Sequence, residues 1–133
     1  MKLPDAEEVA LFRLKFDCPC GCGKNNTDDL FLNEILFAQG VAGFEFIITS
    51  GFRCQWHNDL VGGDKGSAAL LGLHADIGYE GYHQCFRIIK ALIGTGFERI
   101  RLYEKHVHVD KHPEGVGPGF WWCEYSKKST QVN

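Results

Sequence analysis

The sequence predicts an α+β fold with a mainly antiparallel sheet and flanking helices. Two segments carry apolar residues at helical spacing, several short segments are β-branched or alternate in polarity, and glycine-rich breaks separate them. Strands that follow one another after short breaks can return as hairpins, which favours antiparallel pairing. A length of 133 residues suits one domain, so we expect a single domain over residues 1–133.

The first half of the chain contains three predicted elements. A short helix spans residues 7–14. A stronger helix begins at Thr27, a good N-cap followed by two aspartates that the helix dipole favours, and it stops at Gly40. The apolar, β-branched segment 44–49 predicts a strand. Residues 53–63 are polar and close with two glycines, so we interpret them as an irregular loop.

The second half contains four predicted strands and one helix. Residues 73–78 alternate in polarity like a short strand. An amphipathic helix is expected over residues 82–93, where glycines follow. Further strands are predicted at residues 99–103, 105–110 and 120–122.

Composition excludes several classes of protein. With 14 lysines and arginines against 17 aspartates and glutamates, the net charge is −3, so no basic excess points to nucleic acid. A hydrophobic content of 44% is too high for a disordered chain. No apolar run is long enough to span a membrane, and the N-terminus lacks the features of a signal peptide. We therefore expect a monomer that is cytoplasmic as made.

Three cysteines alternate within five positions: Cys18, Cys20 and Cys22. Their side chains share a face if the segment is extended, and neighbours this close rarely form disulfides with one another. Without a secretory signal, free thiols or a thiolate metal site are expected. The alternatives are reduced cysteines, a structural zinc that also uses Cys54 or His57, and a disulfide to Cys54 or Cys123.

Histidine is concentrated in two predicted strands. His74 and Asp76 are two residues apart, so they share a face about 6.5 Å apart along the strand, and His106 and His108 do the same. If the two strands are close in the sheet, these four side chains converge. Two histidines and a carboxylate that leave one position open are the composition of a catalytic zinc site. The alternative is an ordinary solvated strand face.

Five segments that span most of the chain resemble, in order, those of a family of zinc peptidases. They are FDCPCGCG (16–23), ITSGFRCQWHNDLVGG (48–63), GSAALLGLHADIGY (66–79), GFERIRLYEKHVHVD (96–110) and the closing FWW. The family includes D-Ala-D-Ala carboxypeptidases, D-alanyl-D-alanine dipeptidases and phage L-alanyl-D-glutamate endopeptidases. Its fold is shared with the Hedgehog signalling domain, and the resemblance implies one catalytic zinc ion.

The third segment departs from the family at the metal site. The family pattern is Ser-x-His-x-x-Gly-x-Ala-x-Asp, in which His and Asp bind zinc, and a later His-Val-Asp supplies the second histidine. Ser67, Asp76 and His108 match this pattern. Ala69 stands where the family has its first metal histidine, and alanine offers no donor atom. His74 stands where the family has a small residue.

These departures leave three hypotheses open. The metal site is relocated and uses His74 or His106; the domain is degenerate and holds no catalytic metal; or the substitution at Ala69 leaves the enzyme active. His74 shares a face with Asp76, as His106 does with His108, so each can supply the missing nitrogen.

The resemblance also implies roles for three other residues. Glu104 is the candidate general base, because it points the same way as His108 in a regular strand. Arg53 matches the family's arginine, which steadies the scissile carbonyl or its oxyanion, and Ser67 shapes the pocket or binds polar ends of the peptide. The alternatives are a surface glutamate for Glu104 and an arginine that closes loop carbonyls for Arg53.

The function implied is hydrolysis of peptidoglycan stem-peptide bonds that involve D-amino acids, by a carboxypeptidase or an endopeptidase. A phage or prophage lysis enzyme that is released to the cell wall fits this reading, as does a small cytoplasmic dipeptidase. The alternatives are a catalytically degenerate module that binds muropeptide or a protein partner, and a protein in which a zinc at Cys18, Cys20 and Cys22 matters more than the histidines.

Overall fold

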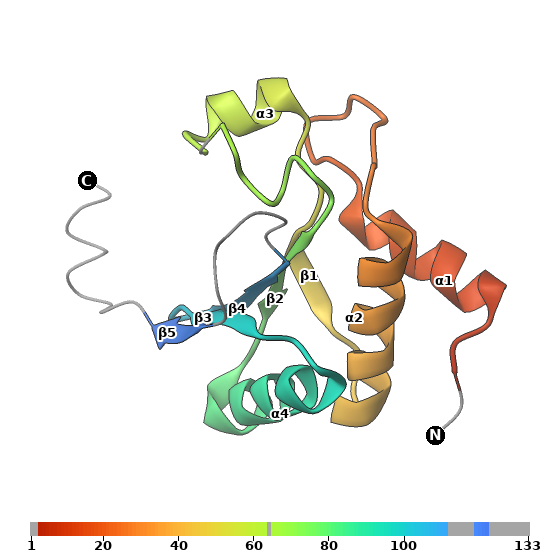
Figure 1. Ribbon diagram of the computed structural model, residues 1–133, viewed down its shortest axis with the longest axis vertical. Coiled ribbons are helices and arrows are strands. Elements are labelled where there is room, and N and C mark those ends of the chain that lie inside the picture. Colours follow the sequence, from red (N-terminus) through yellow and green to blue (C-terminus); the bar gives the residue numbers. More distant parts are fainter. Residues whose placement is uncertain (1–2, 64, 112–118, 123–133) are drawn as a thin grey trace.

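The computed structural model describes residues 3–63, 65–111 and 119–122, which form one sheet with helices packed against it (Figure 1). The helices are α1 (Ala6–Arg13), α2 (Asp29–Ala42), α3 (Gln55–Leu60) and α4 (Gly81–Thr95), with a 3-10 turn η1 (Leu14–Phe16). The strands are β1 (Ile47–Ser50), β2 (His74–Gly78), β3 (Arg99–Leu102), β4 (His106–Asp110) and β5 (Gly119–Trp122). No helix in these ranges is both long and apolar enough to cross a bilayer.

The strands lie in the order β1-β2-β4-β3-β5. The first three pairs of neighbours are antiparallel, and only β3 and β5 run parallel. The predicted α+β fold with a mainly antiparallel sheet is therefore confirmed. β2 and β4 are hydrogen-bonded neighbours in the interior of the sheet, although α4 and β3 separate them along the chain.

The two faces of the sheet differ in polarity. The face that packs on the helices carries fully buried apolar side chains: Ala75 and Ile77 from β2, and Val107 and Val109 from β4. They belong to one core with apolar side chains of α2 and α4, and these two helices also pack on each other (Figure 1). Because side chains alternate along a strand, the residues between them face away from this core. The opposite face is where the polar residues of β2 and β4 lie.

α2 differs from its predicted bounds at both ends. Its N-cap is Asp28 and not Thr27, because the Asp28 carboxylate accepts a hydrogen bond from the Phe31 amide at 3.0 Å. The helix continues through Gly40, which was the expected stop, and ends at Gly43, where φ is +82°. A glycine inside a helix costs only about 1 kcal/mol, and burial of the apolar side of α2 offsets it.

The segment 53–63 is not the irregular loop that its polarity predicted, because α3 forms within it. Cys54 caps this helix, with its sulfur accepting a hydrogen bond from the His57 amide at 3.4 Å. Cysteine is not among the usual capping residues, so the sequence carried no recognised start signal. β1 is also shorter than predicted, since the Phe46 amide donates to the Gln39 side chain at 2.8 Å rather than to a strand.

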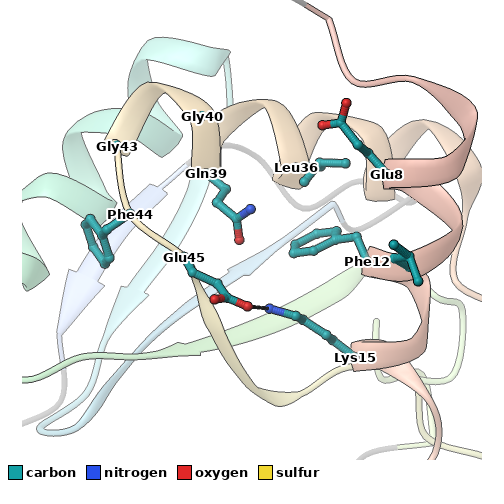
Figure 2. A pocket seen from close by; sticks show the side chains of 10 residues that line it. Glu8, Phe12, Lys15, Leu36, Gln39, Gly40, Gly43, Phe44 and Glu45 are labelled. Atoms are coloured by element: carbon teal, nitrogen blue, oxygen red, sulfur yellow. Dashed lines mark hydrogen bonds and ion pairs between the residues drawn. The ribbon is translucent and has the colours of Figure 1, made fainter.

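A surface hollow of about 500 Å³ lies on the helical side of the molecule, lined by α1, α2 and the segment that follows α2 (Figure 2). Its polar side chains already have partners. Lys15 Nζ contacts Glu45 Oε1 at 2.6 Å, and Gln39 Oε1 accepts the hydrogen bond from Phe46. No residue with a predicted catalytic or metal-binding role lines it. We therefore place the candidate site on the polar face of the sheet.

Candidate functional site

The register between β2 and β4 brings the polar residues of the two strands together. Asp76 lies directly opposite His108, and His74 lies opposite Asp110. Side chains that face one another across an antiparallel pair have their Cβ atoms about 4.5–5.5 Å apart. The backbone hydrogen bonds between β2 and β4, which lie side by side in Figure 1, therefore hold His74, Asp76 and His108 together on one face of the sheet.

Three side-chain atoms meet at the centre of this cluster. His108 Nδ1 lies 2.9 Å from Asp76 Oδ1 and 3.2 Å from His74 Nδ1. His74 Nδ1 lies 3.9 Å from the same aspartate oxygen. Nitrogen and oxygen ligands sit about 2.0–2.1 Å from zinc, so in a tetrahedral site they are roughly 3.3 Å apart. The donor set of His74, Asp76 and His108 therefore fits a zinc ion in both chemistry and spacing.

The opposite nitrogen of each histidine is held by a neighbour. His74 Nε2 contacts Ser50 Oγ at 3.1 Å, and His108 Nε2 contacts Asp110 Oδ2 at 2.6 Å. The other oxygen of Asp110 accepts a hydrogen bond from Arg99 Nε at 2.6 Å. Such outer partners fix the orientation of metal-binding histidines. Here they turn both Nδ1 atoms toward the shared point.

Sequence reasoning missed the parts played by Ser50 and Asp110. Asp110 had a signal, because it continues the alternation of the two histidines that precede it in β4. Ser50 had none, because the register of β1 on β2 shifts by one residue between Ile48 and Ser50. This bulge places Ser50 opposite Asp76, whereas a regular ladder would pair it with the buried Ala75.

Burial and charge set the ionisation of the cluster in the absence of metal. Burial is the main reason why the pKa of His74 is lowered to about 4, so this ring is neutral near pH 7. Burial also opposes charge on His108, but hydrogen bonds to Asp110 and Asp76 outweigh it and raise the pKa to about 9. Burial alone would raise the pKa values of both aspartates, yet their contacts with His108 lower them.

His106 lies at the edge of the cluster. Its Nε2 is 3.8 Å from Asp76 Oδ2, whereas His74 and His108 approach the other oxygen, Oδ1. Its ring stacks on the Tyr103 ring with centroids 4.5 Å apart. His106 therefore contacts the group formed by His74, Asp76 and His108, but it does not belong to the set of donor atoms that meet at its centre.

Arg53 and Ser67 are linked to each other. Arg53 Nη2 donates to Ser67 Oγ at 3.3 Å, and the positive charge of Arg53 is one of the causes that lower the pKa of His74. Arg53 Nε is buried and has no hydrogen-bond partner among the described residues. The Nε–H group of Arg53 therefore lies inside the protein without an acceptor among these residues.

Glu104 is not placed as the strand argument required. β4 begins at His106, and Glu104 lies exposed in the turn between β3 and β4. Strand alternation therefore does not bring its carboxylate to the face of His108, and its role as general base stays a prediction.

Ala69 is itself fully buried, and it lies in a turn whose backbone contacts both Ser67 and Arg53. Its amide donates to Ser67 Oγ at 3.2 Å, and its carbonyl accepts from the Arg53 amide at 3.2 Å. The alanine side chain at position 69 adds no donor atom to the group formed by His74, Asp76 and His108.

The sulfur atoms of Cys18, Cys20, Cys22 and Cys54 form a second group, with all ligand atoms within 4.8 Å of one another. The five cysteines in the described ranges are free thiols, and Cys123 lies outside those ranges. The three N-terminal cysteines lie in a turn and not in the extended segment that their alternation suggested.

Comparison with known proteins gives one finding. A family model described as Peptidase M15 matches residues 16–110, which is well over half of the chain. The matched region includes both clusters, Arg53 and Ser67. No curated protein matches the chain.

Proposed function

We propose that this chain, which belongs to the Peptidase M15 family, is a zinc peptidase that binds its metal through His74, Asp76 and His108. The observation that carries the proposal is the arrangement of three donor atoms 2.9–3.9 Å apart on adjacent strands. Their outer partners Ser50 and Asp110 support it, since neither would be needed to orient the rings of an ordinary solvated face.

The exchange of residues in the third segment then has a simple interpretation. Ala69 has lost the nitrogen that the family pattern supplies, and His74 gains one two residues before Asp76. His74 shares the polar face of β2 with Asp76, and its Nδ1 lies 3.2 Å from His108 Nδ1. Of the three hypotheses, this geometry favours the relocated site.

The chemistry proposed is hydrolysis of an amide bond. When bound, zinc polarises a carbonyl oxygen and lowers the pKa of a bound water to about 7, which supplies a nucleophile at neutral pH. Arg53 donates to the oxygen of the scissile group as negative charge develops there. Ser67 fixes the guanidinium through the 3.3 Å hydrogen bond and supplies a hydroxyl to polar groups of the peptide.

A general base must accept a proton from water and pass it to the leaving amine. We retain Glu104 for this role and add His106 as a second candidate, because its Nε2 lies 3.8 Å from Asp76 Oδ2. Replacement of each in turn, Glu104→Gln and His106→Gln, separates them. The variant that loses hydrolysis while retaining zinc identifies the base.

The proposed substrates are peptidoglycan stem peptides, cut at a bond that involves a D-amino acid. The resemblance of the five segments supports this class, and it covers both carboxypeptidase and endopeptidase action. Two short peptides separate the two activities: one that ends in D-Ala-D-Ala, and one that contains an internal L-Ala-D-Glu bond. An all-L peptide of the same length is the control.

The metal site is tested with variants in which the residues at positions 69 and 74 are changed toward the family pattern. His74→Ala should lose the zinc of this site and lower hydrolysis by roughly a thousandfold, because metal chemistry contributes several kcal/mol. The double variant Ala69→His with His74→Ala restores the family pattern and should recover metal. The exposed His83→Ala is the matched control.

Retention of this zinc in His74→Ala would refute the relocated site. Binding of muropeptide by the wild-type protein, without bound zinc and without hydrolysis, would instead support a degenerate binding module. Hydrolysis of neither peptide by zinc-loaded protein would refute the proposed substrate class but not the metal site.

A further inference from the structure

The four-cysteine group lies where two segments distant in sequence meet. Cys18, Cys20 and Cys22 belong to the turn after η1, and Cys54 is the N-cap of α3, which lies beside that turn in Figure 1. Cys20 Sγ is 3.5 Å from Cys18 Sγ and 3.6 Å from Cys54 Sγ. Sulfur ligands about 2.3 Å from zinc in a tetrahedral site are roughly 3.8 Å apart, which is close to these separations.

Three of the sulfur atoms also accept backbone hydrogen bonds. The Cys54 amide donates to Cys18 Sγ, the His57 amide to Cys54 Sγ and the Lys24 amide to Cys22 Sγ, each at 3.4 Å. N–H donors aimed at sulfur stabilise thiolates and orient them as metal ligands. Four thiolates on one divalent ion leave a net charge of −2, which these donors partly offset.

The backbone of the turn is shaped to bring the sulfur atoms together. Gly21 and Gly23 have φ values of +85° and +78°, a conformation open to glycine, and they lie on either side of Cys22. The turn is tied at its base by the Cys18 amide, which donates to the Lys24 carbonyl at 3.1 Å. The glycines explain how a C-x-C-x-C spacing reaches one point without an extended strand.

The apolar packing between the two segments themselves is small, and a backbone hydrogen bond from the Phe52 amide to the Phe16 carbonyl at 3.0 Å joins the chain just before each of them. The small cluster beneath them consists of Cys18, Phe52 and Cys54, with Cys20 partly buried against it. Cys22 is exposed. A hollow of about 510 Å³ lies beside Cys20, Cys22 and Cys54, so the sulfur atoms are accessible to an ion from solvent.

We propose that Cys18, Cys20, Cys22 and Cys54 bind a second zinc ion, structural in role, that fastens the turn after η1 to the start of α3. The four thiols release their protons to solvent as the ion binds. Four sulfur ligands leave no open position for a substrate, so this ion takes no part in hydrolysis. It holds Cys54 in place, and with it the adjacent Arg53.

Elemental analysis of the purified full chain tests the proposal, with two zinc ions per chain expected. The double variant Cys20→Ser with Cys22→Ser should retain one ion, and Cys85→Ser, which replaces a buried cysteine outside the group, should retain two. His74→Ala should also retain one ion, in this case the ion bound by the four cysteines. Failure of this second site would leave the histidine site intact, so the two proposals fail separately.

Replacement of zinc by cobalt shows whether sulfur ligands bind the ion. The main result, a sulfur-to-cobalt band, is read from the wild-type protein. Wild-type protein and His74→Ala should both show the near-ultraviolet sulfur-to-cobalt charge-transfer band, and the double cysteine variant should lose it. Absence of this band from wild-type protein would overturn the proposal, as would unchanged zinc content in the double cysteine variant. Iron in place of zinc, or disulfides under reducing purification, would overturn it too.

Discussion

The histidine cluster and the four-cysteine cluster differ in what brings their donor atoms together. His74, Asp76 and His108 stand on two strands whose register is fixed by backbone hydrogen bonds and by a buried apolar face. The cysteines stand on a turn and a helix cap that share a small apolar cluster, the hydrogen bond from the Cys54 amide to Cys18 Sγ and, beside them, a hydrogen bond from the Phe52 amide to the Phe16 carbonyl. The first site is therefore largely formed without metal, whereas we expect the proposed second ion to strengthen the link between the two segments that carry the cysteines.

Because of this difference, we expect loss of metal to have different effects at the two sites. Removal of zinc from the strand site should take away chemistry and leave the backbone in place. Removal of zinc from the thiolate site should loosen the turn after η1 and leave the sheet unchanged.

Chelation of both ions should have the largest effect. Hydrolysis should fall by roughly a thousandfold. Amide exchange should accelerate by about tenfold or more in residues 18–24, while amides of β2 and β4 keep their protection. Hydrogen exchange followed by mass spectrometry measures both regions in one experiment, and zinc added back is the control. Equal acceleration in β2 and β4 would break the comparison.

Asp110→Asn should weaken zinc binding at the strand site about 10- to 100-fold, the usual effect of removing an outer carboxylate from a metal-binding histidine. The carboxylate contacts His108 Nε2 at 2.6 Å, and asparagine keeps its shape without its charge. Competition with a chromogenic chelator measures the affinity. Asp59→Asn, on the exposed face of α3, is the matched control. An unchanged affinity would remove Asp110 from the site.

Ser50→Ala should have the smallest effect. It removes one neutral hydrogen bond to His74 Nε2, worth about 1 kcal/mol, so zinc affinity should fall about fivefold. The same competition assay measures it. Thr49→Val, in the preceding position of the same strand, should change affinity by less than that. An effect of Thr49→Val as large as that of Ser50→Ala would show that the bulge does not select the residue that orients His74.

Prediction from sequence succeeded where the signal was local. The i, i+2 spacing of His74 with Asp76, and of His106 with His108, placed each pair on one face of a strand, and both strands formed within a residue of their predicted bounds. It failed for α3, whose cap is a cysteine, and for Glu104, because a turn begins before it. Neither the cap nor the end of a strand was marked by a residue type that signals it.

The amino-acid pattern alone determined which residues share a face, because alternation along a strand is a property of a few consecutive residues. It also determined that the family's first metal histidine is absent, at Ala69. Tertiary structure decided which strands are neighbours, which residue of β1 reaches His74, and that Cys54 completes the cysteine group. These depend on register and on contacts between distant segments, which are set by burial of the whole core rather than by any local sequence.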